Sequence, residues 1–376
     1  MKDHFLNHKL DQRRDAGNIR SLQLKNLPYD FTSNDYLGLA RNEELFQRIH
    51  DRVGQEGVKL NGSGGSRLLS GNSQLAEDLE RKLASLFNAD AALLFNSGYT
   101  ANLSLISSVA GKDDTILYDQ LAHVCLKEGA WLSRAASLKF LHNDLEDLER
   151  KLQVAKGQKF IVTESVFSMD GDEAPIREIV KLAEKYDAQI IIDEAHSTGC
   201  YGENGNGWLC EKELESKIFA RVYTFGKGVG AHGACVCGSV VLKEYLINFG
   251  RSFIYTTALP IHSVITIDEA FNYISMHPEL SNLLNKKIDH FLIELEKIRD
   301  KLVDQIESRS AIQPIIIPGN DRIKQVAEGL QSKGFDVRPI LAPTVSTGEE
   351  RLRVSLHTFN SEDEIGSLIN ELEKLI

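Results

Sequence analysis

A lysine flanked by glycines is the first candidate catalytic group in the sequence. Lys227 lies between Gly226 and Gly228, directly after a short apolar run, and Thr224 places a hydroxyl close by. Such a lysine is poorly placed for a solvated helix face, and the glycines let the backbone approach a ligand. A lysine amine activated by its surroundings can form a Schiff base with an aldehyde cofactor. A lysine on a surface loop is the alternative, and this segment alone leaves both open.

A carboxylate at the end of an apolar run is the second candidate. Asp193 follows Ile190, Ile191 and Ile192 and begins an Asp-Glu-Ala-His stretch that ends at His196. Burying a carboxylate is costly without a cationic partner, and a protonated pyridine nitrogen would be such a partner. The same four residues form a motif of nucleic-acid helicases, which also need a G-x-x-x-x-G-K-[ST] loop. The Gly-Lys pairs here are not followed by Ser or Thr, so the helicase interpretation is excluded.

Two glycine-containing segments could contact phosphate. Residues 96–102 read Asn-Ser-Gly-Tyr-Thr-Ala-Asn between an expected strand and an expected helix, where free N–H groups and the helix dipole favour an anion. Tyr99 would add a flat ring beside a cofactor, although strand–turn–helix junctions are common without one. Residues 61–72 are rich in glycine and serine, but no strand precedes them as the dinucleotide fingerprint requires.

The elements that would position these groups alternate between strands and helices. Short apolar runs occupy residues 91–95, 115–118, 138–141, 160–163 and 189–193, with helical patterns at 121–132 and 176–186. Continuous apolar strands between amphipathic helices predict an α/β fold with a mainly parallel sheet covered on both faces. Ligands of such sheets collect at the carboxyl ends of the strands, where the candidate residues lie.

The pattern changes after about residue 260. A long helical stretch at 261–306 precedes a strand at 312–317, a helix at 323–333, a strand at 352–356 and a last helix that begins with a Ser361–Glu364 capping box. We therefore predict an N-terminal segment (1–45), a large cofactor-binding domain (46–260) and a smaller α+β C-terminal domain (261–376).

Taken together, the motifs resemble those of the α-oxoamine synthases, pyridoxal-phosphate enzymes with the aspartate aminotransferase fold (fold type I). The resemblance extends over nearly the whole chain. It rests on residues 31–39 (Phe-Thr-Ser-Asn-Asp-Tyr-Leu-Gly-Leu), 62–67, 97–99, 119–123 (Asp-Gln-Leu-Ala-His), 164–172 (Glu-Ser-Val-Phe-Ser-Met-Asp-Gly-Asp), 193–196, 224–227 and 351–354 (Arg-Leu-Arg-Val).

The resemblance assigns roles to individual residues. Lys227 would hold pyridoxal phosphate and move the α-proton, Asp193 would pair with the pyridine nitrogen, His123 would stack on the ring, and His196 would bond its O3′. Further positions implied to bind the cofactor are Gly98, Tyr99, Ser168 and Thr224, with Thr256 or Thr257 reaching the phosphate of a partner subunit in a homodimer. Positions implied to bind substrate are Arg20, Asn34, Thr344 and Arg351, with Arg351 holding the carboxylate.

Some of these residues also have ordinary structural explanations. His123 could simply begin a helix, Ser168 could cap a turn, Arg20 could be a solvated charge, and Arg351 could form a salt bridge at a strand edge. These alternatives stay open at the level of sequence.

The resemblance implies decarboxylative condensation of an amino acid with an acyl thioester. The forms of residues 62–67 and of the Thr344-Val345 pair favour the branch that joins L-alanine to pimeloyl-CoA, or its carrier-protein thioester, in biotin synthesis. Other branches use glycine with acetyl-CoA or serine with palmitoyl-CoA, and an aminotransferase or an inactive interaction module is a more distant alternative. Leu341 stands where the favoured branch often has an arginine, which would weaken selection for a carboxylated chain; Arg20 or Arg338 could supply that charge.

Composition excludes several other classes of protein. The net charge of −11 over 376 residues argues against binding along nucleic-acid phosphates. No apolar run approaches the roughly 20 residues of a spanning helix, and the polar start lacks a signal peptide, so we expect a cytoplasmic protein without membrane contact. The five cysteines include no C-x-x-C pair, and no metal site is expected.

Overall fold

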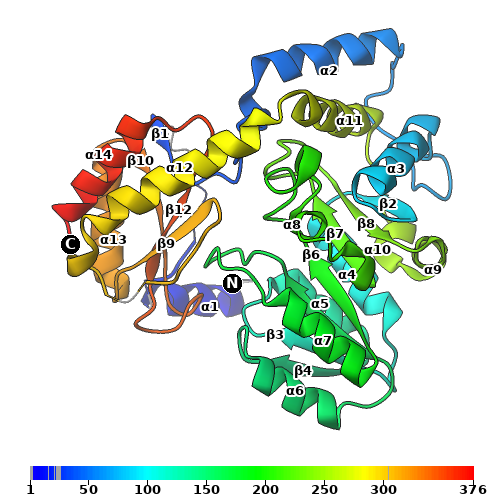
Figure 1. The fold of residues 1–376 in the computed structure, drawn as a ribbon, viewed down its shortest axis with the longest axis horizontal. Helices are drawn as coiled ribbons and strands as arrows, with labels where there is room; N and C mark the ends of the chain where they lie inside the picture. Colours follow the sequence, from blue (N-terminus) through cyan, green and yellow to red (C-terminus); the bar gives the residue numbers. More distant parts are fainter. Residues whose placement is uncertain (1–2, 16, 21, 23–26, 304) are drawn as a thin grey trace.

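The largest element of the fold is a seven-stranded sheet (Figure 1) in the order β2-β8-β7-β6-β5-β3-β4. The computed structural model describes residues 3–15, 17–20, 22, 27–303 and 305–376. The strands of this sheet are β2 (Ala91–Phe95), β3 (Thr115–Asp119), β4 (Ala136–Phe140), β5 (Lys159–Glu164), β6 (Ala188–Asp193), β7 (Ala220–Thr224) and β8 (Ala234–Gly238). Strands β7, β6, β5, β3 and β4 pair in parallel, and β8 runs antiparallel to both of its neighbours, β2 and β7.

Helices cover both faces of this sheet, as the continuous apolar strands predict. One buried cluster joins the sheet to α4 (Gly98–Val109), α5 (Val124–Leu132) and α9 (Val240–Phe249), and another joins its opposite face to α6 (Leu145–Val154) and α7 (Ile176–Tyr186). Short helices α8 (Trp208–Glu211) and α10 (Arg251–Ile254) complete these layers. The predicted mainly parallel α/β fold is confirmed.

The C-terminal unit is a separate antiparallel sheet with helices packed on it. Strands β9 (Ile312–Ile316), β12 (Arg351–Ser355) and β11 (Arg338–Ile340) form the sheet, and α12 (Glu279–Glu296), α13 (Asn320–Ser332) and α14 (Glu362–Glu373) lie around it (Figure 1). The predicted capping box at the start of α14 is present, with Ser361 and Glu364 each accepting from the other's backbone N–H.

The predicted long helical stretch over residues 261–306 is divided into two α-helices. The stretch contains α11 (Ile261–Met276) and α12, separated at His277 and Pro278. A proline restricts the residue before it to extended conformations, and His277 leaves the helical region with φ −124° and ψ 61°. Helix α11 packs against α2 (Glu43–Gln55) and α3 (Gln74–Leu86) of the large domain. This packing favours a domain boundary at the α11–α12 turn over one at residue 260.

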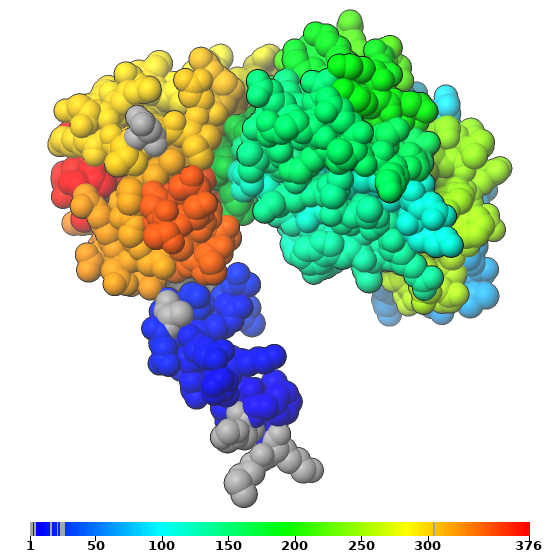
Figure 2. Space-filling model, turned by 90° about the horizontal axis from the view of Figure 1, so that it is seen from below, coloured from blue at the N-terminus to red at the C-terminus, as the bar shows by residue number. Residues whose placement is uncertain are grey.

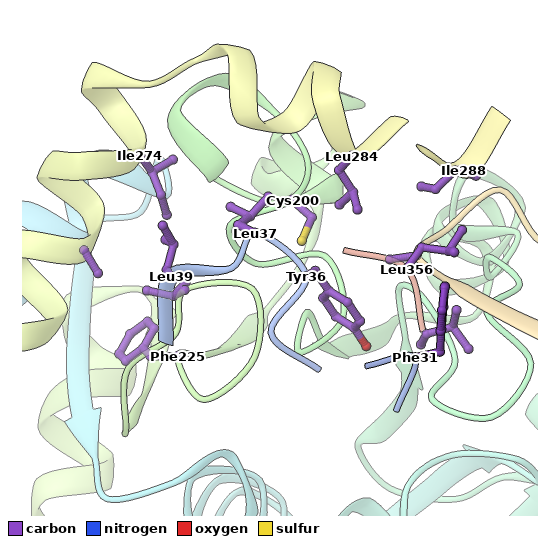
Figure 3. Close-up of a cluster of buried hydrophobic side chains, with 14 of the residues drawn as sticks. Phe31, Tyr36, Leu37, Leu39, Cys200, Phe225, Ile274, Leu284, Ile288 and Leu356 are labelled. Atoms are coloured by element: carbon purple, nitrogen blue, oxygen red, sulfur yellow. The ribbon is translucent and has the colours of Figure 1, made fainter. Parts of the chain in front are cut away.

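The segment before α2 joins the two units. Strand β1 (Tyr29–Asp30) pairs in parallel with β10 (Phe335–Asp336), so it belongs structurally with the C-terminal unit. Residues 31–39 then cross to the large domain through a shared core, where Phe31 and Tyr36 are completely buried (Figure 3). Helix α1 (His4–Asp15) projects away from this body, below the C-terminal unit in Figure 2.

Candidate active site

A cavity of about 250 Å³ opens at the carboxyl ends of the central strands. The residues that line it follow β2, β3, β5, β6 and β7, so the parallel topology brings together segments that are far apart in sequence. Most of the predicted cofactor residues are among them. The lining residues are Asn34, Ser97, Gly98, Tyr99, His123, Cys125, Glu164, Asp193, Ala195, His196, Thr224, Gly226, Lys227, His232 and Gly233.

The amine of Lys227 lies inside this cavity. Its Nζ is 2.8 Å from Nε2 of His196, whose Nδ1 lies 2.7 Å from the Tyr36 hydroxyl. Burial lowers the pKa of Lys227, and the nearby carboxylates of Asp193 and Glu164 oppose this effect by raising it. A lowered pKa increases the fraction of uncharged, nucleophilic amine. Burial also lowers the pKa of His196, which is therefore a neutral imidazole beside that amine.

Gly228 lies close to other parts of the chain instead of letting the backbone approach a ligand, and Gly230 is equally crowded. An added Cβ on Gly228 would lie 2.7 Å from Cys200 Sγ and from the Thr198 carbonyl, and one on Gly230 would lie 2.4 Å from the Ala40 nitrogen. These glycines therefore pack the lysine loop against neighbouring segments of the chain, and only Gly226 lies at the cavity.

Asp193 is buried and held in place by two donors. Its Oδ2 accepts from Asn102 Nδ2 at 2.7 Å, and its Oδ1 accepts from the Ala195 N–H at 2.8 Å. Burial raises the pKa of Asp193, whereas the positive charge of Lys227 and these hydrogen bonds lower it. A cationic ring nitrogen in the cavity would stabilise the ionised carboxylate further.

The residues present fit a phosphorylated aldehyde cofactor. Thr224 Oγ1 is buried, and no residue that the structure describes forms a hydrogen bond with it. It lies beside the start of α4, whose first N–H groups have no partner within the helix and favour an anion. Gly98 is needed there, because an added Cβ would lie 2.3 Å from Thr224 Cγ2. Thr224, Gly98 and the start of α4 thus form a polar site in the same cavity as Lys227.

His123 caps the start of α5 and lines the cavity. Its ring is edge-on to Tyr99, with 6.4 Å between ring centroids, and its backbone N–H donates to Glu164 Oε1 at 2.6 Å. Burial raises the pKa of Glu164 to about 8, with the nearby Asp193 adding to the rise. Glu164 thus positions the histidine through the backbone and leaves its ring facing the cavity.

Several predicted residues lie outside this cavity. Ser168 contributes its carbonyl oxygen, which accepts from Arg353 Nε at 2.7 Å. Thr256 accepts from Asn96 Nδ2 at 3.0 Å, and Thr257 is exposed. Arg20 is also exposed, beyond the end of α1. The structure therefore does not bring Ser168 or Arg20 to the cofactor cavity.

Arg351 and Thr344 line a second cavity, of about 430 Å³, between the large domain and the C-terminal unit. Arg351 is 2% exposed and forms an ion pair with Asp170. Its guanidinium is therefore neutralised, and this placement does not suit the predicted grip on a substrate carboxylate. Leu341, at the expected arginine position, packs against the hydrophobic core and lies outside the lining of this cavity.

Arg353 lies behind Asn34, one of the residues that line the cofactor cavity. Its Nη2 donates to Asn34 Oδ1 at 3.0 Å and lies 3.5 Å from the Tyr36 hydroxyl. Within the part of the chain that the structure describes, no carboxylate lies within 4.0 Å of its guanidinium. Arg353 is therefore a better candidate than Arg351 for the residue that would hold the substrate carboxylate.

Sequence reasoning also gave no role to several groups around the site. Asn102 and Glu164 lie within the quoted motifs. A polar residue near the end of a strand or the start of a helix was the feature that could have pointed to them. Tyr36 also lies within a quoted motif, residues 31–39, but a tyrosine followed by leucine gives no sign of a role at the site. Its position beside His196 follows from the chain crossing between the two units.

The fold and this site define a pyridoxal-phosphate enzyme of fold type I. Residues 28–372 match the family described as aminotransferase class I and II, and the chain belongs to that family. Within it the chain is an α-oxoamine synthase, an acyltransferase similar to 8-amino-7-oxononanoate synthase. It is 39% identical over 363 residues to the 8-amino-7-oxononanoate synthase of Emericella nidulans, covering 91% of this chain and 88% of the relative. It is 36% identical over 387 residues to 8-amino-7-oxononanoate synthase 2 of Bacillus subtilis, covering 99% and 97%.

Solved structures agree with this assignment. A serine palmitoyltransferase from S. paucimobilis with a bound PLP–myriocin aldimine matches with a TM-score of 0.88 at 25% identity, over 100% of this chain and 97% of that one. The 8-amino-7-oxononanoate synthase from Francisella tularensis matches with a TM-score of 0.78 at 27% identity, over 93% and 97%. Pyridoxal phosphate is the cofactor. Among the helices in the described residues, none is long and apolar enough to cross a membrane.

Proposed function

We propose that this protein condenses L-alanine with a pimeloyl thioester to give 8-amino-7-oxononanoate. In this reaction the alanine Cα bonds to the thioester carbonyl carbon, the CoA or carrier thiol leaves, and the alanine carboxyl is lost as carbon dioxide. The observation that carries the proposal is the cavity in which Lys227, Asp193, His196 and His123 meet beside Arg353. The names of the relatives at 36–39% identity support the choice of substrates.

Each residue around this cavity has a task in that reaction. The cofactor, when bound, supplies an electron-accepting ring. Lys227 holds the cofactor and takes the α-proton, while Asp193 keeps the ring nitrogen charged. His123 and His196, which line the same cavity, would help to hold the cofactor there. Arg353 binds the carboxylate of the amino acid and thereby orients the bonds at its Cα.

The substrate assignment is tested with a matrix of amino acids and thioesters, following thiol release. Alanine with pimeloyl-CoA, or with pimeloyl-carrier protein, should give the highest kcat/KM. A preference for glycine with acetyl-CoA would move the protein to the 2-amino-3-ketobutyrate CoA ligases. Serine with palmitoyl-CoA is the second candidate, favoured by the full-length structural match to serine palmitoyltransferase.

We also propose that the active enzyme is a homodimer in which Thr256 or Thr257 reaches the partner's cofactor phosphate. The supporting observation is an exposed apolar surface around this segment: Tyr255 is 79% exposed and Leu69 is 84% exposed. The two lie on adjoining loops, since the Ala258 N–H donates to the Gly65 carbonyl at 2.9 Å. Sedimentation should give twice the chain mass of 42.0 kDa. A fully active monomer would contradict the proposal.

A further inference from the structure

The second cavity adjoins the cofactor cavity along the chain. Gln120 and Leu121 line the second cavity, and His123 lines the first. Figure 2 shows a hollow between the large domain and the C-terminal unit. Residues of both units line the second cavity. Apolar side chains that suit a methylene chain make up part of the lining: Leu121, Phe167, Met169, Pro343 and Val345.

Two cations line this second cavity, and one of them is already neutralised. Arg351 pairs with Asp170, and its Nη2 also lies 3.7 Å from Glu349. Lys127 is half-buried, and its Nζ donates to the Gln120 carbonyl oxygen at 2.7 Å. No carboxylate lies within 4.0 Å of that amine in the ranges that the structure describes. Lys127 thus presents a positive charge without an acidic partner.

Asp119 and Glu164 are the carboxyl groups whose charges act on Lys127, and both bind other partners. Asp119 accepts from the backbone N–H of Leu121 and of Asn143 and pairs with His142 at 3.0 Å. Burial alone would lower the pKa of His142, but Asp119 and Asp172 raise it to about 10, so the imidazole is cationic near neutral pH. Glu164 accepts from the His123 N–H, and burial favours its protonated form. The charge of Lys127 is therefore available to an anion.

We propose that Lys127 binds the distal carboxylate of the acyl chain and so selects a dicarboxylic thioester. This inference rests on the proposed function and names the residue that recognises the far end of the acyl donor. Lys127 lies four residues after His123 along α5, about 6 Å along the helix axis from the wall of the cofactor cavity. An acyl chain that leaves the reacting centre through the apolar lining would place its far end near this amine. Leu341 and the ion-paired Arg338 lie outside that lining.

The test compares Lys127→Met with the native holoenzyme on two donors of equal length, pimeloyl-CoA and its methyl ester. Charge-assisted hydrogen bonds have the strength to change kcat/KM by roughly ten- to a hundredfold. We expect a loss of that size for pimeloyl-CoA, mainly through KM, and little change for the ester. Lys127→Arg should restore most of the discrimination. Lys139→Met, which removes a nearby exposed lysine outside the cavity, should behave as the native protein.

Other outcomes would overturn the inference. An equal loss of kcat/KM with both donors would mean that Lys127 binds the CoA phosphates or only stabilises the start of α5. No loss of kcat/KM with either donor would mean that Lys127 does not contact the acyl donor. If the native enzyme turns over no pimeloyl thioester, the proposed function fails before any variant is made. Equal melting temperatures of the variants would exclude a general loss of folding.

Discussion

Replacing Lys227 with alanine should lower kcat/KM by at least roughly a thousandfold. In the proposed function the amine both holds the cofactor and moves a proton, and general acid–base catalysis alone contributes roughly 10²- to 10⁴-fold. Its position 2.8 Å from His196 in the cofactor cavity is the structural basis of this expectation. Borohydride reduction of the native protein should fix the cofactor to Lys227, as peptide mass spectrometry would show.

Lys112 offers a matched control for this experiment. It also follows a glycine, but it is exposed and lies outside the cofactor cavity. Lys112→Ala should keep native activity and native labelling. Cofactor found on another lysine, or sustained turnover by Lys227→Ala, would refute the assignment.

Replacing Arg353 with methionine should raise KM for the amino acid and lower kcat/KM by about ten- to a hundredfold, because a charge-assisted contact is lost. The KM for the acyl thioester should change little. The expectation rests on the donation from Arg353 to Asn34 at the cavity wall and on the absence of a carboxylate partner among the described residues.

Arg351 supplies the comparison, because its expected defect is in stability. Removing one partner of a buried ion pair costs about 3–5 kcal/mol, so Arg351→Met should melt at a lower temperature. Replacing both partners, in Arg351→Met with Asp170→Leu, should recover much of that loss while leaving KM for alanine near native. If the double variant raises this KM and Arg353→Met does not, the original assignment to Arg351 is correct.

The two arginines show where sequence reasoning reaches its limit. They are two residues apart on β12 and therefore point to the same side of the strand. Which of the two arginines lies near the cofactor cavity depends on how β12 packs against residues 168–170. Arg353 donates to the Ser168 carbonyl and Arg351 pairs with Asp170, two contacts that join the separate units. Spacing alone does not contain that information.

Other parts of the structure were predictable because local signals agree with the fold. The apolar runs became strands to within about two residues, although β4 is buried only at Phe140. The parallel topology then placed Asp193, Thr224 and Lys227 at one edge. The break between α11 and α12 was not predicted, because the apolar pattern continues across Pro278. Gly228 was misread because Thr198 and Cys200, which crowd it, come from another part of the chain.

The central claim is that this enzyme joins an amino acid to an acyl group with loss of the amino acid's carboxyl carbon. The most direct measurement supplies L-alanine labelled with ¹³C at the carboxyl carbon, together with pimeloyl-CoA, to the purified holoenzyme. We predict that labelled carbon dioxide and free CoA appear in equal amounts and that the amino ketone product carries no label. Label retained in pyruvate, with no release of CoA, would indicate an aminotransferase and contradict the account.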